Sequence, residues 1–327
     1  MHVKAFEYLV RNGLLKHNVK FIFEGEEEVG SKHLPAWVEA NKERLACDVI
    51  LVSDTTMISD KVPSINCGMR GVTYLQVNVK GPDKDLHSGH YGGAVANPIN
   101  TLCEMIATLI DKDGRVTIPG FYDDVAVVSD ADRQELARAP FDMEEYKESI
   151  GIREVKGEKG FTTLERTAIR PCLDVCGIWG GYTGAGSKTV LPSEAHAKIS
   201  MRIVPDQKAD KILDMAAKHI LAIAPPYASV TVEKMAAGNG FLIPITSSAY
   251  KAASRAMAEV YGIEPVPSRG GGSICVLADM RNILGADPLL MGFGLERGTI
   301  HSPNESYLLR QFYAGIESIA LFYKYWE

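Results

Sequence analysis

Three consecutive carboxylates, Glu26 to Glu28, are the most distinctive chemical feature of this 327-residue sequence. They lie in the segment Glu-Gly-Glu-Glu-Glu-Val-Gly-Ser at 24–31, directly after the β-rich run Val19–Phe23. Adjacent carboxylates repel one another unless a cation or solvent compensates their charge. The turn alone therefore leaves two alternatives open, a solvated acidic loop or one wall of a cation site.

A second carboxylate favours the cation site. Asp54 follows the apolar run Val49–Val52, which predicts a strand, and Val19–Phe23 predicts another. Neighbouring parallel strands are about 5 Å apart, so their ends would bring Glu28 and Asp54 together at one edge of a sheet. Carboxylate oxygens suit a hard or borderline divalent ion, and zinc also accepts imidazole ligands.

Two of the eight histidines lie in loops that could supply this imidazole. His301 precedes a predicted C-terminal helix, and His87 lies in a glycine-rich loop. A lone loop histidine is more often an ordinary surface residue, and Asn304 could serve only as the N-cap of the last helix. The glycine turn at 270–273 could hold an anion with its backbone N–H groups, although such turns are common.

Strand and helix patterns alternate at both ends of the chain, which predicts an α/β domain with a mixed sheet covered by helices. The middle of the chain differs, because alternating apolar residues such as those at 72–80 predict half-buried strands. We therefore predict a catalytic domain formed by residues 1–69 and 239–327. An α+β insert at 70–238 interrupts it.

Composition excludes several classes of protein. Hydrophobic residues make up 46% of the chain and charged residues 23%, a balance that allows a sizeable core and excludes disorder and coiled coil. The net charge of -6 argues against nucleic-acid binding, and the apolar runs are too short to cross a membrane. Six scattered cysteines and the lack of a signal peptide predict free thiols in the cytoplasm.

Seven ordered motifs cover nearly the whole chain: the acidic turn at 24–31, Ser53-Asp54, Asp85–Gly89, Gly186–Pro192, Met201–Pro205, Gly270–Ser273 and His301–Glu305. In order and spacing they resemble the motifs of the carnosinase-like dipeptidases, which include the cytosolic non-specific dipeptidases. These are dinuclear zinc metallopeptidases related to carboxypeptidase G and to the acetylornithine and succinyl-diaminopimelate deacylases.

The resemblance implies a fold, a metal centre and a base. The fold is a phosphorylase/hydrolase-like mixed-sheet catalytic domain interrupted by an α+β lid, which is also the dimerisation domain. Glu27 matches the general base, while Glu28, Asp54 and His301 match ligands of two divalent metals, which are zinc, manganese or cobalt. A base beside a metal-activated water suits the hydrolysis of a peptide bond near neutral pH.

The resemblance also implies a homodimer that binds a dipeptide, or a similar small substrate with a free carboxylate. His87 matches a lid histidine that polarises the scissile carbonyl in the partner's site, and Thr189 matches a second lid residue offered to that site. Arg202 and Ser273 match residues that hold the substrate carboxylate. Arginine suits this task because its planar fork makes two parallel hydrogen bonds to a carboxylate.

Two motifs of the family have no counterpart in this sequence. The family carries a His-x-Asp motif on an early strand, and an Asp-Asp-Lys-Gly-like stretch with a bridging carboxylate before the helix that Met1–Val10 resembles. Here neither His2 nor His17 begins a His-x-Asp pattern, and the first aspartate is Asp48. We therefore expect a chain that lacks the N-terminal segment of the family, holds metal weakly and hydrolyses dipeptides negligibly.

Three functions stay open at this point. A metal-dependent dipeptidase is favoured, because the long charged stretch at 113–170 is typical of the larger lid of the dipeptidase branch. The second function is deacylation of N-acyl amino acids. The third is that of a catalytically inactive, metal-free dimer built on the same fold.

Overall fold

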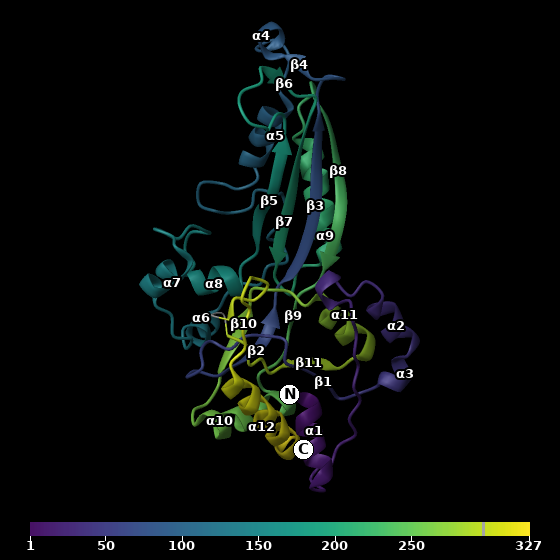
Figure 1. Cartoon of the computed structure of the whole chain (residues 1–327), viewed down its shortest axis with the longest axis vertical. Helices are drawn as coiled ribbons and strands as arrows, with labels where there is room; N and C mark the ends of the chain where they lie inside the picture. The colour runs from purple at the N-terminus through teal and green to yellow at the C-terminus, as the bar shows by residue number, and fades with distance from the viewer. Residues whose placement is uncertain (296–297) are drawn as a thin grey trace.

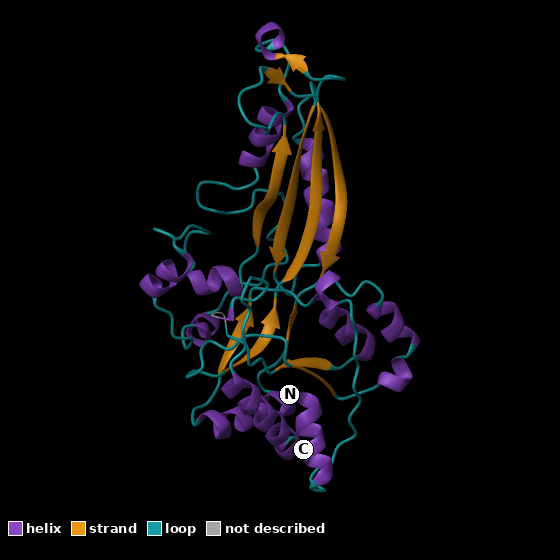
Figure 2. Ribbon diagram, viewed as in Figure 1, coloured by secondary structure: helices purple, strands orange, loops and turns teal. Residues whose placement is uncertain are grey.

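Two β-sheets, one beyond the other along the long axis of the molecule, organise the chain (Figure 1). The computed structural model describes residues 1–295 and 298–327. Each sheet has its own hydrophobic core, and the two cores are separate clusters of buried side chains. Helices and strands combine into a mixed α/β structure, as the sequence predicted (Figure 2).

The lower sheet in Figure 1 contains both parallel and antiparallel strands. Its order is β1-β11-β2-β10, and β9 pairs with β2. The pairs β1–β11 and β10–β2 are parallel, whereas β11 and β9 run antiparallel to β2. The strands are β1 (Val49–Val52), β2 (Ser64–Met69), β9 (Phe241–Leu242), β10 (Val266–Gly270) and β11 (Asp287–Leu290).

In the described residues, six α-helices and one short 3-10 helix belong to the two chain segments that form this sheet, and α6 (Asp130–Leu136) and α8 (Thr163–Ala168) also contact β10. The last helix packs against both α10 and α1, and its Phe322 is fully buried. None of the helices in the described part of the chain is both long and apolar enough to span a membrane. The helices are α1 (His2–Arg11), η1 (Glu27–Val29), α2 (Leu34–Ala40), α3 (Lys42–Leu45), α10 (Ser248–Tyr261), α11 (Cys275–Leu284) and α12 (Leu309–Tyr325).

The upper sheet is antiparallel, in the order β5-β7-β3-β8, and two helices cover one of its faces. Along β3 the odd-numbered residues from Gly71 to Val79 are buried, and the even-numbered ones are partly exposed, which is the alternation that the sequence predicted. The elements are β3 (Gly71–Lys80), α5 (Pro98–Ala107), β5 (Cys172–Gly180), β7 (Glu194–Ile203), α9 (Ala209–Ala222) and β8 (Ser229–Gly238).

One local prediction was wrong, and some other elements were not predicted. Val19–Phe23 is not a strand, because β1 pairs with β11 and a cavity lies between β1 and this segment. The residues from Leu34 to Leu45 form two helices, because the Asn41 side-chain amide donates to the Trp37 carbonyl and ends α2. Strands β2 and β10 were not predicted: β2 is short and buried at every residue, and β10 does not alternate between apolar and polar residues.

The chain passes between the two sheets twice, and the two passages touch. A Cβ on Gly71 would overlap the carbonyl oxygen of Gly238, and a Cβ on Gly240 would lie 2.6 Å from the carbonyl oxygen of Met69. Only glycine allows backbones to approach this closely. The two connections therefore form one compact junction between the sheets.

A buried ion cluster holds the long stretch at 113–170, which includes α6 (Asp130–Leu136), α7 (Met143–Ile150) and α8 (Thr163–Ala168). Glu158 is 5% exposed and accepts two hydrogen bonds of 2.7 Å from the Arg170 guanidinium. Arg115 donates a third bond of 2.9 Å to the same carboxylate, and both guanidinium groups lie over the Tyr122 ring. Charge-assisted bonds thus replace part of the apolar core in this stretch.

We predict that Glu158→Gln destabilises the protein by about 3–5 kcal/mol, because it leaves the buried Arg170 without its counter-charge. Urea unfolding followed by circular dichroism measures the change. The control is Glu144→Gln, which breaks an ion pair with Lys147 in which the glutamate is 77% exposed. The control should unfold like the wild type, and equal stability of all three proteins would contradict the prediction.

Candidate active site

A rigid turn presents the acidic residues at 24–31. It forms the short helix η1, which ends at Gly30 in the left-handed conformation with φ of 91°. The Ser31 hydroxyl donates to Glu24 Oε1 at 2.8 Å, and His33 Nδ1 lies 2.8 Å from Glu26 Oε2. Glu24 and Glu26 are thereby bound within the turn itself.

His301 meets Glu28 at the exposed side of this turn. The distance between His301 Nε2 and Glu28 Oε2 is 3.1 Å, and their side chains are 72% and 76% exposed. The loop that carries the histidine is tightly curved, because His301 and Asn304 both adopt positive φ angles. Asn304 does not cap the last helix, whose N-cap is Leu308.

Glu27 lies at the centre of the acidic group. Burial raises the pKa of the Glu27 carboxyl, and the charges of Asp54, Glu28 and Glu24 raise it further, whereas His301 lowers it. Asp54 follows the end of β1, but the expectation that a paired strand at 19–23 delivers the turn was wrong. Instead, the short helix η1 within the turn positions Glu27 beside Asp54. A carboxylate whose pKa is raised toward neutral pH is better suited to accept a proton.

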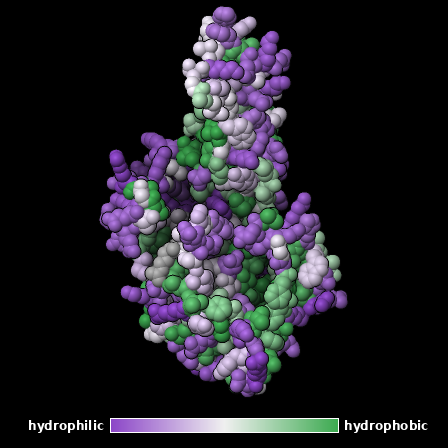
Figure 3. Space-filling view, in the orientation of Figure 1, coloured by the Kyte–Doolittle hydropathy of each residue, from purple (hydrophilic) through white to green (hydrophobic). Residues whose placement is uncertain are grey.

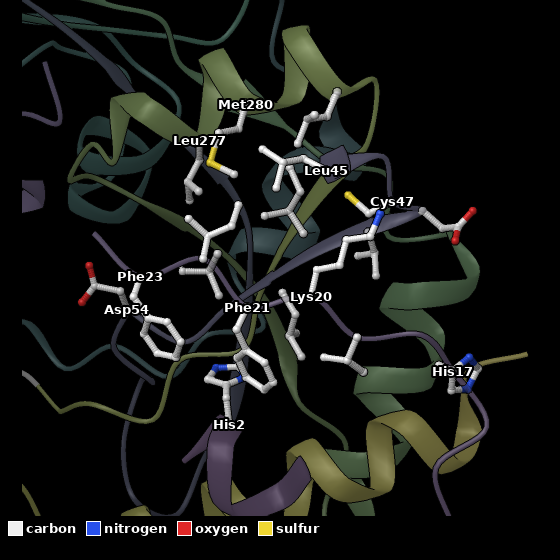
Figure 4. Close-up of a pocket in the computed structure, with 18 of the residues that line it drawn as sticks. His2, His17, Lys20, Phe21, Phe23, Leu45, Cys47, Asp54, Leu277 and Met280 are labelled. Atoms are coloured by element: carbon white, nitrogen blue, oxygen red, sulfur yellow. The ribbon is translucent and has the colours of Figure 1, made fainter. Parts of the chain in front are cut away.

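A large cavity opens beside the acidic group (Figure 4). Its volume is about 1100 Å³, and its lining extends from Glu27 and Asp54 to all of β1 and to Leu277 and Met280 on α11. On the face drawn in Figure 3, apolar side chains gather around a hollow in the lower half, while the upper half is mostly hydrophilic. The acidic group thus lies at the border of an apolar chamber.

His2 lines the same cavity and contacts the residue before Asp54. Its Nε2 lies 2.8 Å from the Ser53 hydroxyl. Burial, together with the charged N-terminus, lowers the pKa of His2 to about 4. The imidazole is therefore neutral near pH 7 and fixes the turn after β1 by a hydrogen bond without adding charge.

Arg202 and Ser273 meet at the junction of the two sheets. Arg202 extends from β7 and donates from Nη1 to the Ser273 hydroxyl at 2.9 Å. That hydroxyl in turn donates to the Arg70 carbonyl oxygen at 2.5 Å. A guanidinium and a hydroxyl held together in this way are suited to bind a carboxylate.

His87 and Thr189 meet at the other end of the upper sheet. Strands β4 (Leu86–His87) and β6 (Val190–Leu191) pair there, and α4 (Ser88–Tyr91) follows. The Ser88 N–H donates to the Thr189 carbonyl at 3.1 Å, and the rings of His87 and His90 are 4.5 Å apart. Figure 1 shows this tip at the far end of the molecule from β1 and α11. Within one subunit, His87 therefore does not join the acidic group.

The donor types at the acidic group suit a divalent metal, but the set is open. Glu28 and His301 could enclose an ion between them, since carboxylate and imidazole are ordinary zinc ligands. Over 1–295 and 298–327, no group of three or more histidine, cysteine, aspartate or glutamate side chains is arranged to hold a metal. The described residues thus fit a two-donor half-site.

The whole chain matches one family of peptidases. Residues 1–325 match the model of peptidase family M20/M25/M40. The chain belongs to this family. It is 32% identical over 314 residues to the Cys-Gly metallodipeptidase DUG1 of Candida albicans, and 31% identical over 326 residues to the Beta-Ala-His dipeptidase of Homo sapiens. These matches cover 94% and 98% of this chain, but only 65% and 64% of the relatives' lengths.

Solved structures agree with this membership. The M20 family metallo-carboxypeptidase Sso-CP2 from Sulfolobus solfataricus superposes with a TM-score of 0.90 at 30% identity, covering 99% of this chain and 74% of that one. Human carnosine dipeptidase 1 gives a TM-score of 0.83 at 29% identity, covering 98% of this chain and 69% of that one. The predicted family and fold are therefore confirmed.

Sequence reasoning missed one residue of this region, Arg70. In the sequence it lies in the run Gly-Met-Arg-Gly at 68–71. Its guanidinium is buried at the junction, and its carbonyl oxygen holds Ser273. A long cation between glycines, at the start of a predicted strand, is the signal that could have drawn attention to it.

We predict that the protein binds zinc more weakly than about 1 μM, because two protein donors hold an ion less firmly than a closed set of four. Calorimetric titration of the metal-free protein measures this affinity. His301→Ala should weaken it about tenfold or more. His33→Ala, which removes the similar pair with Glu26, is the matched control and should leave it unchanged. Equal affinities in all three proteins would place the metal elsewhere.

Proposed function

We propose that this protein carries out metal-dependent hydrolysis of the peptide bond of dipeptides. The observation that carries the proposal is the position of Glu27, a carboxyl with a raised pKa beside Asp54 and the Glu28–His301 pair. The names of the relatives, a Cys-Gly metallodipeptidase and a Beta-Ala-His dipeptidase, support a dipeptide as the substrate class.

In this proposal Glu27 accepts a proton from the attacking water and returns it to the leaving amine. Glu28, Asp54 and His301 would hold two divalent metals, which are zinc, manganese or cobalt. Such ions would acidify water and polarise the scissile carbonyl. Because the described donor set is open, we expect slow turnover.

Arg202 and Ser273 bind the terminal carboxylate of the dipeptide in the same proposal. The guanidinium supplies charge and two parallel donors, and the hydroxyl adds a third donor once its single proton turns from the Arg70 carbonyl oxygen to the ligand. The Arg202–Ser273 contact of 2.9 Å supports this role, because it holds both groups together before a ligand arrives. A free carboxylate is then a requirement for tight binding.

We propose a homodimer that associates through the lid. The support is the position of His87 and Thr189, which lie at the lid tip and away from the acidic group of their own subunit. The edge strand β5 offers a surface for association, since Ile178 is 50% exposed and Trp179 is 42% exposed. A second subunit would bring its own His87 to the site.

The domain division at 1–69, 70–238 and 239–327 belongs to the same proposal. Two separate core clusters support it, because each sheet buries its own apolar side chains. We further propose a cytoplasmic location, which the free state of all six cysteines supports.

The proposed activity is tested with Cys-Gly and β-Ala-His against N-acyl amino acids, in the presence of zinc or manganese. We predict dipeptide turnover far below the ~1–10³ s⁻¹ typical of enzymes, abolished by Glu27→Gln and kept by Glu26→Gln. Turnover of N-acyl amino acids alone would indicate a deacylase. A protein that holds no metal and hydrolyses neither class would be the inactive dimer. Rapid dipeptide hydrolysis would show that the open donor set does not limit the rate.

The dimer is tested by light scattering over a wide range of concentration. We predict that Ile178→Asp converts a dimer to a monomer, because it places a charge on the exposed edge of β5. Ile263→Asp is the matched control, since Ile263 is 46% exposed but lies in the other part of the chain, after α10. A wild type that stays monomeric, or a dimer that survives Ile178→Asp, would contradict this interface.

A further inference from the structure

Arg70 is a buried cation held by carbonyl oxygens. The residue is 8% exposed and lies between β2 and β3, where the chain first crosses between the sheets. Among the hydrogen bonds of the described residues, its guanidinium donates to carbonyl oxygens and to the Cys172 sulfur, with no carboxylate as acceptor. A buried charge of this kind is costly unless several acceptors surround it.

The acceptors come from two separate segments. Nη1 donates to the carbonyl oxygens of Arg166 and Arg170 at 3.3 and 3.2 Å, which belong to the end of α8. Carbonyl groups at a helix C-terminus lack partners within the helix and attract a cation. Nε donates to the Gly271 carbonyl oxygen at 3.2 Å. One planar group thus joins α8 to the turn at 270–273.

The backbone of the same residue holds the other end of that turn. The Arg70 N–H donates to the Gly270 carbonyl at 3.4 Å, and its carbonyl oxygen accepts the Ser273 hydroxyl at 2.5 Å. The turn at 270–273 is therefore bound at its first, second and fourth residues by one amino acid. A side chain on Gly271 would press against the guanidinium, since its Cβ would lie 3.2 Å from Nη2.

We propose that Arg70 is a positioning residue for the carboxylate pair Arg202 and Ser273. It fixes the turn that carries Ser273 against α8, and so sets where the serine hydroxyl meets the Arg202 guanidinium. The inference rests on the proposed function, because it assigns to this pair the binding of a substrate carboxylate. Through Arg70, the carbonyl oxygens at the end of the stretch at 113–170 also contribute to binding of the substrate carboxylate.

A purely structural role for Arg70 would have a different consequence. Loss of a buried anchor would lower stability and would weaken all ligands alike. Loss of a positioning residue should weaken ligands that carry a carboxylate and spare those that do not. Arg170 provides the matched control, because it is 7% exposed and lies at the same end of α8, but its guanidinium binds Glu158.

The experiment compares N-acetylglycine with N-acetylglycinamide, which differ only in the carboxylate and lack a metal-chelating amine. Ligand-observed NMR in metal-free buffer measures their affinities for the full chain. The variants are Arg70→Lys, Arg70→Met and Arg170→Lys, and thermal unfolding reports whether each folds. Arg70→Lys keeps the charge, but an ammonium cannot span the same three carbonyl oxygens. If Arg70→Met fails to fold, Arg70→Lys carries the test.

We expect wild type to bind the acid more tightly than the amide. Both Arg70 variants should bind the acid about tenfold more weakly, the effect of losing one well-aligned bond to a charged group, and should bind the amide as wild type does. Arg170→Lys should keep the preference. Arg70 variants that keep the full preference would overturn the inference and leave the proposed function intact. A wild type without any preference would overturn the proposed carboxylate site and the inference with it.

Discussion

Two passages of backbone lie in direct contact between the sheets, and the relation of every other part depends on that contact. The absence of side chains at Gly71 and Gly240 lets the passages touch, while Arg70 fills the space beside them. Because β3 and β8 leave this point side by side, the upper sheet meets the lower part of the molecule here. Any change in backbone spacing there would shift Arg202 relative to Ser273.

A second constraint is the repulsion among the carboxylates around Glu27. Several carboxylates raise the pKa of Glu27, and only His301 opposes them. The protein therefore concentrates negative charge at the border of an apolar cavity, where water solvates it less well than in an open loop. Hydrogen bonds from Ser31 and His33 inside the turn partly offset the charge of Glu24 and Glu26.

The strongest local patterns of the sequence predicted the structure well. Alternation identified β3. The pair Asn97-Pro98 is typical of a helix start, and α5 begins there, where the Asn97 side chain accepts the Ile99 N–H. Asp142 and Gly151 are residue types typical of helix ends, and α7 lies between them. These features depend on residues close together in the chain, so a sequence pattern can record them.

Features that depend on distant segments could not be predicted in this way. Val19–Phe23 has the composition of a strand, yet strand formation needs a neighbouring strand, and a cavity separates this segment from the open edge of β1. Arg70 binds Arg166 and Gly271, which lie about 100 and 200 positions further along the chain. The acidic turn was recognised by its residue types, whereas its approach to His301 follows from the fold.

The edge of β1 has a consequence for how the protein behaves in concentrated solution. In the part of the chain that the structure describes, β1 has a strand on one side only, and its residues line the cavity on the other. All four of its residues are apolar, and no lysine or proline blunts the edge. Such an edge is a template onto which an extended polypeptide can add as a further strand. The solubility of the protein is then tied to whatever occupies this edge, and a strand added there would shield apolar surface from water beside the acidic group.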